Sequence, residues 1–403
     1  MSRRYADLPL HYGHVPPWLA ERMTKLGGAI VEALVIEFGK SEVLKRLSDP
    51  LWFQAFGSVL GMDWHSSGIT TSVMGALKRA LNPKSRELGI FICGGRGKHS
   101  RQTPQELLKL AAHTGLNGDA LVRSSKLAAK VDNTAVQDGF QLYLHNFIVT
   151  DEGEWAIVQQ GMNDASGMAR RYHWHSLQFQ SYLDSPHSGV TGVNQGLILN
   201  LADTHAAGTR KSIVKLTEES PDRMMTEIRK IVMPRHHEVR ASDVNLKRLG
   251  AALILAHERS TTEFESLLLL EGVGPRTIQS LTLVSEIIYG SPTRFNDPAR
   301  FSFAHGGKDG HPFPVPLKVY DETISVLKSA VEKSRIGVSD KQQAIQQLSA
   351  MAWKIEQDFE PAPFFEELVE KERRESHLHG GMTVFGKAPP SKKRERPRQL
   401  GLF

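Results

Sequence analysis

The sequence predicts an α+β fold, in which a mixed α/β domain containing a sheet is followed by an all-helical domain and a disordered tail. Two runs rich in β-branched and aromatic residues, 140–150 and 154–160, flank the turn-forming Asp151-Glu152-Gly153, and this pattern predicts a β-hairpin. From Pro221 to about Asp358 apolar residues recur at helical spacing. We therefore expect an α/β domain over 1–205, a helical domain over 206–375 and a flexible basic tail over 376–403.

Local signals define further elements of the first domain. Helix formers with periodic apolar residues are followed by glycine or by Asn-Pro, and proline appears at helix starts. These signals predict a helix from Trp18 to Phe38 that ends at Gly39, a helix over 70–81, a short strand over 87–93, and a helix that begins at Thr103-Pro104.

Composition narrows the class of protein. The 403 residues carry 50 Lys and Arg against 44 Asp and Glu, a formal net charge of +6. Cys93 is the single cysteine, which excludes an intramolecular disulfide and a zinc site built on cysteines. No apolar run approaches the roughly 20 residues that span a bilayer, and the N-terminal segment has no apolar signal region. We expect a cytoplasmic, nucleoid-associated protein.

Most of the net charge lies in the tail. Residues 390–403 hold five Lys or Arg against Glu395, a balance of +4, which leaves +2 for the first 389 residues. Because the body is nearly neutral, DNA binding by the body must come from local geometry rather than from overall charge.

The segment 264–290 carries the most specific internal motif. A short apolar helix is predicted to run into Gly272-Val273-Gly274, and a second helix to open at Pro275. The N–H groups of such a turn suit a phosphate, and Arg276 and Thr277 add donors. The segment resembles the helix-hairpin-helix motif, which binds the DNA backbone without reading sequence. The alternative is an ordinary helix corner with a glycine cap.

The last five residues carry a second motif. Gln399, Leu400, Leu402 and Phe403 resemble the peptide by which bacterial proteins bind the DNA polymerase sliding clamp. The preceding Pro-rich, basic stretch suits a flexible tether. The alternative is an apolar chain end, or a short terminal strand that packs on the body.

Several segments together resemble a bacterial and archaeal family, domain of unknown function 763. The resemblance covers roughly residues 1–350 and implies little chemistry, because the family has no assigned function. The matching segments are 135–143, 154–163, 170–174, 233–237, the hairpin segment and 297–310.

A metal-dependent nuclease is the favoured activity. Such enzymes hold Mg²⁺ or Mn²⁺ with carboxylates, and Asp138 and Glu154 each precede a predicted strand of the β-hairpin. We expect these two residues as metal ligands, with Gln160 and His173 completing the catalytic set. The alternative for Asp138 and for the acidic turn near Glu154 is plain turn chemistry.

Two further functions remain open. Base-excision glycosylases carry a helix-hairpin-helix followed by a catalytic Asp roughly 20 residues later, for which Asp309 and Asp321 are candidates. The other is a non-enzymatic adaptor that brings a repair factor to the clamp.

All three hypotheses take DNA as the partner, with single-stranded or branched forms favoured. Besides the hairpin, the expected DNA contacts are Arg96, Lys98, Arg170, Arg171 and Lys308, with solvated turns or a partly buried helix end as the alternative.

Overall fold

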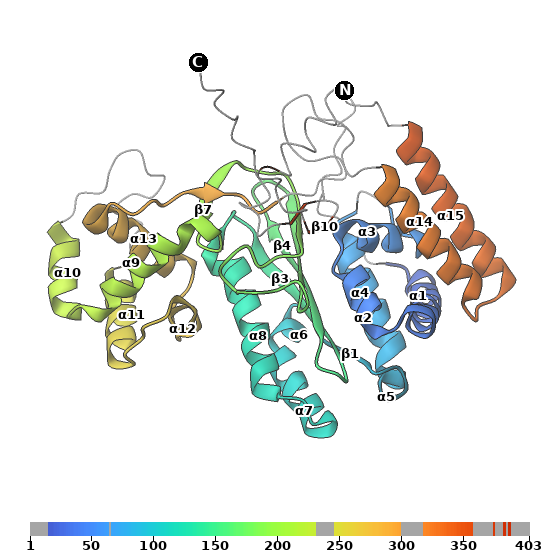
Figure 1. Cartoon of the computed structure of the whole chain (residues 1–403), viewed down its shortest axis with the longest axis horizontal. Helices are drawn as coiled ribbons and strands as arrows, with labels where there is room; N and C mark the ends of the chain where they lie inside the picture. Colours follow the sequence, from blue (N-terminus) through green and yellow to red (C-terminus); the bar gives the residue numbers. More distant parts are fainter. Residues whose placement is uncertain are drawn as a thin grey trace, which may run out of the picture.

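The computed structural model describes residues 15–63, 66–230, 246–299 and 317–357, together with 374, 382–383 and 386–387. Its centre is a five-stranded antiparallel sheet (Figure 1). In spatial order the strands are β1 (Ile90–Arg96), β3 (Gln141–Thr150), β4 (Trp155–Asn163), β5 (Met168–His175) and β6 (Gly189–Thr191). The α+β class is thereby confirmed, and so is the predicted β-hairpin, which is β3–β4.

The two faces of this sheet are covered by different helices. Residues that pair across strands share a face, so Phe147, Ile157 and Trp174 lie on one face, here called face A. Their neighbours Ile148 and Val158 lie on the opposite face B. Face B packs against α1 (Pro17–Phe38), α2 (Lys40–Leu47), α3 (Pro50–Val59) and α4 (Gly68–Leu81), and face A packs against α7 (Thr103–Thr114) and α8 (Gly118–Lys130).

Short elements join these layers. Between α4 and α7 lie η1 (Asn82–Lys84), α5 (Ser85–Leu88) and α6 (Lys98–Arg101). A π-helical turn, η2 (Val131–Ala135), directly extends α8 and leads into β2 (Val136–Gln137). The strand β2 pairs with β7 (Leu197–Asn200), which in turn pairs with β8 (Phe295–Asn296) to form a second, three-stranded sheet.

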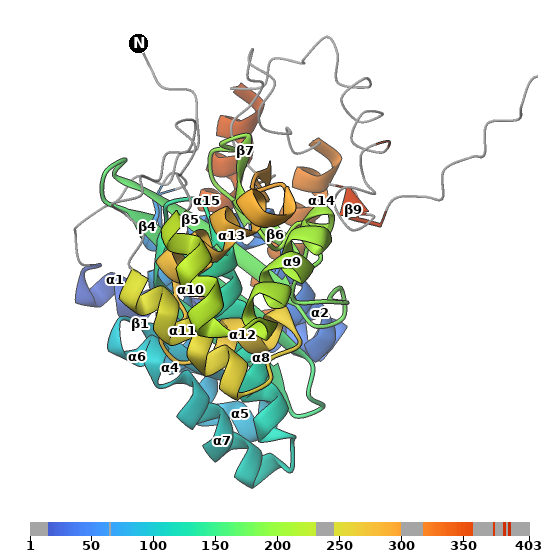
Figure 2. The same cartoon turned by 90° about the vertical axis from the view of Figure 1, so that its left-hand side faces the viewer.

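A group of helices follows the sheet in the sequence and stands beside face A (Figure 2). It comprises η3 (Thr204–Ala206), α9 (Ala207–Glu218), α10 (Pro221–Lys230), α11 (Leu246–Glu258), α12 (Phe264–Leu269) and α13 (Pro275–Tyr289). Its buried residues, among them Leu253, Leu267 and Ile278, belong to the same apolar core as Phe147 and Trp174. The helical group is therefore continuous with the sheet domain.

The last two long helices pack elsewhere than expected. In α14 (Leu317–Lys333) and α15 (Val338–Gln357), Leu327 and Leu348 share a core with Ile30 of α1 and Phe56 of α3. The expected helical domain over 206–375 is thus not one unit, because its C-terminal helices cover the N-terminal ones (Figure 1). Apolar periodicity predicted the helices but carries no information on which surface each one covers.

The local predictions succeed where their signals are strongest. The helix expected from Trp18 to Phe38 is α1, and Gly39 ends it with a φ of +83°. The polar residues 161–176 carry no strand signal in the sequence, yet half of them form β5 and the first three end β4. Of the expected tail, only 382–383 and 386–387 are described within 376–403, as the paired strands β9 (Met382–Thr383) and β10 (Gly386–Lys387). Among the described residues no helix is long and apolar enough to cross a membrane.

Candidate functional site

The turn between α12 and α13 exposes bare backbone. Gly272 has a φ of +79°, and a Cβ placed on Gly272 or Gly274 would meet no atom within 4 Å. Gly274 precedes α13 and has no side chain with which to cap the helix. The first N–H groups of a helix have no partner within the helix itself, so those of α13 are left to bind a ligand or water. We call Gly272–Thr277 the glycine turn.

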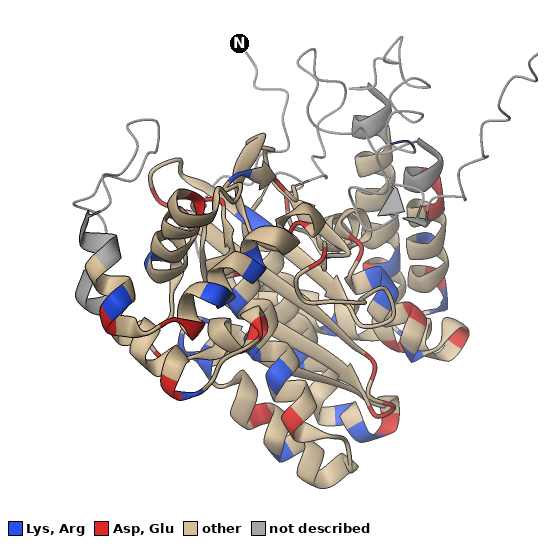
Figure 3. Cartoon of the chain, turned by 60° about the vertical axis from the view of Figure 1, so that its left-hand side comes forward, with Lys and Arg blue, Asp and Glu red and all other residues tan. Residues whose placement is uncertain are grey.

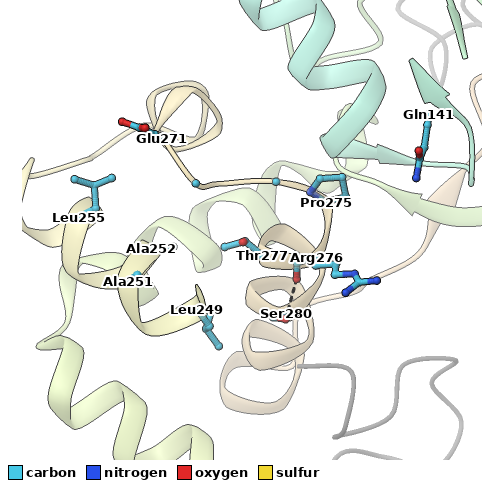
Figure 4. Close-up of a pocket in the computed structure, with 12 residues that line it drawn as sticks. Gln141, Leu249, Ala251, Ala252, Leu255, Glu271, Pro275, Arg276, Thr277 and Ser280 are labelled. Atoms are coloured by element: carbon cyan, nitrogen blue, oxygen red, sulfur yellow. Dashed lines mark hydrogen bonds between the residues drawn. The ribbon is translucent and has the colours of Figure 1, made fainter. Parts of the chain in front are cut away.

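A pocket of about 640 Å³ opens at the glycine turn. This volume lies within the roughly 300–1,000 Å³ that is usual for ligand sites. One wall is apolar and comes from α11, with Leu249, Ala252 and Leu255. The rest of the lining adds backbone and polar side chains. It comes from Glu271, Gly272, Gly274, Pro275, Arg276, Thr277, Ser280 and, across the pocket, Gln141 of β3 (Figure 4).

The glycine turn is fixed to the sheet domain by two hydrogen bonds. Lys130 Nζ, at the end of α8, donates to Val273 O (2.5 Å), and Gln137 Nε2, on β2, donates to Pro275 O (2.8 Å). These residues flank η2 on either side. Burial lowers the pKa of Lys130. Two carbonyl groups of the turn, Val273 O and Pro275 O, are therefore held by the sheet domain, while Gly272 and Arg276 are exposed.

A buried polar network lies next to this attachment, on face A. Asp132 in η2 accepts hydrogen bonds from Gln159 Nε2 (2.6 Å) and Trp174 Nε1 (2.9 Å). His145 Nδ1 lies 2.8 Å from Gln159 Oε1, and its Nε2 lies 2.8 Å from Ser125 Oγ.

The bonds around His145 fit the neutral form of its imidazole. Burial lowers the pKa of His145 to about 4, so the ring is neutral at pH 7. Its Nδ1–H then donates to Gln159, and its Nε2 accepts from Ser125. This order of bonds is also that of a nucleophile and its base. However, Ser125 is only 2% exposed, so in this structure the network stabilises the core.

A second buried cluster joins the two sheets. Arg170 donates two hydrogen bonds to Asp297 (2.9 and 3.0 Å) and a third to Asp138 (2.9 Å), and all three side chains are fully buried. Tyr172 also donates to Asp138 (2.6 Å), and the backbone N–H groups of Gln195 and Ala299 donate to Asp297. Burial raises the pKa of Asp138, against the effect of Arg170. We call Asp138, Arg170, Tyr172 and Asp297 the Arg170 cluster.

Face B carries a third network around Arg171. Its guanidinium donates to Gln54 (2.9 Å) and to His173 Nε2 (2.9 Å), and it also lies 3.4 Å from Thr70 Oγ1. Thr70 in turn donates to Gln160. Burial lowers the pKa of Arg171 to about 9 and holds that of His173 well below its usual value.

The expected catalytic residues do not form one site. The β3–β4 register pairs Gln141 with Met162 at one end of the hairpin and Val149 with Trp155 at the other. Asp138 precedes the first end and Glu154 the second, so they are separated by the length of the strands, about 25 Å. They cannot hold one metal ion, which corrects the expected ligand pair. Gln160 and His173 do come together, through Thr70 and Arg171, but inside face B.

The proposed ligands therefore do not fit a magnesium site. Asp138 is occupied by Arg170 and Tyr172, and Glu154 lies at the turn between β3 and β4. Within the described parts of the chain, no group of three His, Cys, Asp or Glu side chains is arranged to bind a metal.

The expected DNA contacts divide into two sets. Arg170 and Arg171 are completely buried, which is incompatible with contact to DNA in this conformation. The basic pattern does not predict this burial. The strand β5 places alternate residues of the stretch on the two faces of the sheet, and both faces are covered. Arg96 and Lys98 are exposed, as is Arg276 of the glycine turn. Lys308 and the clamp peptide with Gln399, Leu400, Leu402 and Phe403 lie outside the described residues.

One acid was overlooked in the sequence. Asp297 follows Gly274 by 23 residues, close to the spacing that the glycosylase alternative requires, whereas Asp309 and Asp321 lie farther along the chain. The structure brings its carboxylate into the Arg170 cluster, where it is 2% exposed. The spacing thus agrees with that alternative, but the burial does not.

Comparison with known proteins identifies the family. Residues 4–315 match the model of the family described as protein of unknown function (DUF763), and the chain belongs to this family. No curated protein and no solved structure matches significantly.

Proposed function

We propose that this protein binds DNA through its sugar–phosphate backbone, with the glycine turn acting as a helix-hairpin-helix, and that it takes part in DNA processing. The observation that carries the proposal is the exposure of the Gly272 and Gly274 backbone at a pocket that also holds Arg276. Backbone N–H groups and an arginine suit a phosphate, and such contacts do not depend on base sequence.

Binding of the purified full-length chain to fluorescein-labelled DNA tests this proposal. We expect Arg276→Glu to weaken binding about tenfold or more at low salt, because it replaces a phosphate-binding cation by a repelling carboxylate. Glu271 lines the same pocket, so Glu271→Gln is the matched control. We expect this variant to bind DNA at least as well as the wild type. Equal binding by the wild type and Arg276→Glu would contradict the role of the turn.

The proposal includes a tether to the sliding clamp. Gln399, Leu400, Leu402 and Phe403 supply the polar and apolar anchors of a short extended peptide, and the basic tail precedes them. Deletion of residues 399–403 is expected to abolish binding to a purified bacterial clamp and to leave binding to DNA unchanged. A deletion variant that still binds the clamp would remove this part of the proposal.

Metal-dependent cleavage is the processing activity that we propose to test first, without assigning its ligands. Single-stranded, duplex and flap DNA are incubated with Mg²⁺, with Mn²⁺ and with EDTA. Cleavage that EDTA abolishes is the expected result. An absence of cleavage on every substrate would favour the adaptor, a DNA-binding protein that localises a partner.

Base excision is a second candidate, favoured by the spacing of 23 residues from Gly274 to Asp297. Release of a free base from damaged duplex by the wild type, and the loss of this release in Asp297→Asn, would favour base excision over cleavage. Because Asp297 also stabilises the fold, the variant's thermal unfolding must be measured alongside.

A further inference from the structure

The end of β1 and the short helix α6 that follows it present cations on a rigid base. Arg96, Lys98 and Arg101 are exposed and form no ion pair with the described part of the chain. The base is fixed, because Gly94 N donates to Glu106 (2.9 Å) and Lys78 Nζ donates to Gly94 O (2.8 Å). We call Gly94–Arg101 the basic loop.

The basic loop and the glycine turn lie at the same end of β3. Arg96 pairs with Leu144, and its guanidinium carbon lies 5.7 Å from the ring centroid of Tyr143. Gln141, two residues before Tyr143 on the same strand, lines the pocket that contains Arg276. Residues two apart along a strand are about 7 Å apart, and neighbouring strands about 5 Å. The first residues of β3 therefore separate the two cationic groups by a short distance.

The pocket itself has an acidic and a basic side. Figure 4 shows Glu271 on the side away from β3, and Arg276 on the side toward Gln141. A phosphate group is repelled by the first and attracted by the second. A strand held at the turn is therefore directed toward β3 and the basic loop.

One part of the pocket wall is apolar. Leu255, which is half-buried, offers an apolar surface opposite the glycine turn, whereas Leu249 and Ala252 on the same wall are almost fully buried. A paired base cannot leave its stack to reach such a surface without an energetic cost, whereas an unpaired base can. Tyr143 is half-buried, with Arg96 over its ring and its hydroxyl accepting a hydrogen bond from Gln160 Nε2 (2.5 Å), so it holds the end of β3 beside Arg96.

We propose that one unpaired DNA strand runs from the glycine turn, across Gln141 and Tyr143, to the basic loop. This inference rests on the proposed function and deepens it, because it assigns the substrate class and a second contact surface. The glycine turn holds one phosphate, and Arg96 and Lys98 hold phosphates farther along the strand. The bound strand thus contacts the helical group at the glycine turn and the sheet domain at the basic loop.

The test compares oligothymidines of about four and about twelve nucleotides, lengths that span the usual site sizes of single-strand binders. The full-length variant Arg96→Glu/Lys98→Glu is compared with Lys109→Glu/Lys328→Glu, which has the same net charge. Lys109 and Lys328 are exposed and form no ion pair within the described residues. A blunt duplex of about the longer length is the third ligand.

We expect the loop variant to bind the longer strand at least about tenfold more weakly than the control variant, and the short strand about equally. The slope of log affinity against log salt should fall by about 1–1.5, because roughly two phosphate contacts are lost. Equal binding of the longer strand by the two variants would overturn the path. Binding of the duplex as tightly as the strand, with the same loss, would overturn the single-strand assignment. If Arg276→Glu by itself did not weaken the binding of any of these DNA ligands, this result would instead count against the proposed function.

Discussion

The two ends of the β3–β4 hairpin differ in how their charges are matched. At the turn between the strands, Asp151 and Glu152 both bind Lys40, at 2.5 and 2.6 Å. At the opposite end, Arg96, Lys98 and Arg276 are exposed without a carboxylate partner among the described residues. We call these the paired end and the basic end.

This difference shows that position, and not net charge, distinguishes a candidate DNA surface in this protein. Lys, Arg, Asp and Glu are interspersed over the body (Figure 3). Exposed ion pairs contribute little to stability, so the pairs at the paired end mainly neutralise one another. Cations without partners remain available to phosphates, and one of them, Arg276, lies beside the open backbone of Gly272 and Gly274.

The largest expected effect comes from the support beneath the basic end. Arg170→Ala leaves Asp138 and Asp297 buried without their cation, which should lower the free energy of unfolding by about 3–5 kcal/mol. Chemical denaturation measures this change. Lys40→Ala at the paired end removes two partly exposed ion pairs and should cost about 1 kcal/mol or less. Similar losses in the free energy of unfolding in the two variants would contradict the difference between the two ends.

A second expectation concerns pH, again beneath the basic end, where His145 pairs with Gly95 of the basic loop's base. The folded pKa of about 4 lies below the unfolded value of roughly 6.5, so the unfolded chain binds the extra proton between these values. Stability from this group is therefore complete above about pH 6.5 and falls as the pH is lowered toward 4, by about 2–3 kcal/mol. Between pH 7 and pH 4, the Tm of thermal unfolding should fall less in His145→Gln than in the wild type. Parallel curves for the two proteins would contradict this.

The glycine turn supplies a smaller and more specific effect. Gly272→Ala places a Cβ at a φ of +79°, which should cost about 1–2 kcal/mol of stability and obstruct the approach of a phosphate. Gly115→Ala is matched, because Gly115 has a φ of +78° and equally open surroundings at the end of α7. We expect equal destabilisation but weaker DNA binding only in Gly272→Ala, measured by anisotropy. Equal DNA affinity in both variants would show that the turn does not contact DNA.

The smallest expected effect is at the paired end. Glu154→Gln should leave DNA binding and any DNA cleavage unchanged, because this residue lies about 25 Å from the basic end. Measured cleavage rates that fall about tenfold or more in this variant would restore Glu154 as a catalytic residue and place the site at the paired end.

Local signals predicted much of the fold. The α1 helix, the β3–β4 hairpin and the helix pair around Gly272 were expected, since periodicity, turn residues and glycine placement act over short distances. The strand β5 was missed because its buried residues include Arg170, Arg171 and His173, which resemble a solvated stretch. Their burial is possible because each finds partners from remote parts of the chain.

The candidate site was predicted in part for the same reason. Gly272–Thr277 is contiguous, so its exposed backbone follows from local residues. Asp138 and Glu154 were paired because each precedes a strand of one hairpin. Their separation follows from the antiparallel direction of those strands, which places the starts of successive strands at opposite ends.

Residue types and their short-range order thus determined the secondary structure and the chemistry available at the turn. The tertiary structure decided which charges meet. It buried Arg170 between Asp138 and Asp297, and it placed the cations of the basic loop at the same end of β3 as Gln141, which lines the pocket of Arg276. The physical reason is that an ion pair or a shared surface depends on distance in space, and strand register and helix packing set that distance over separations of more than 100 residues.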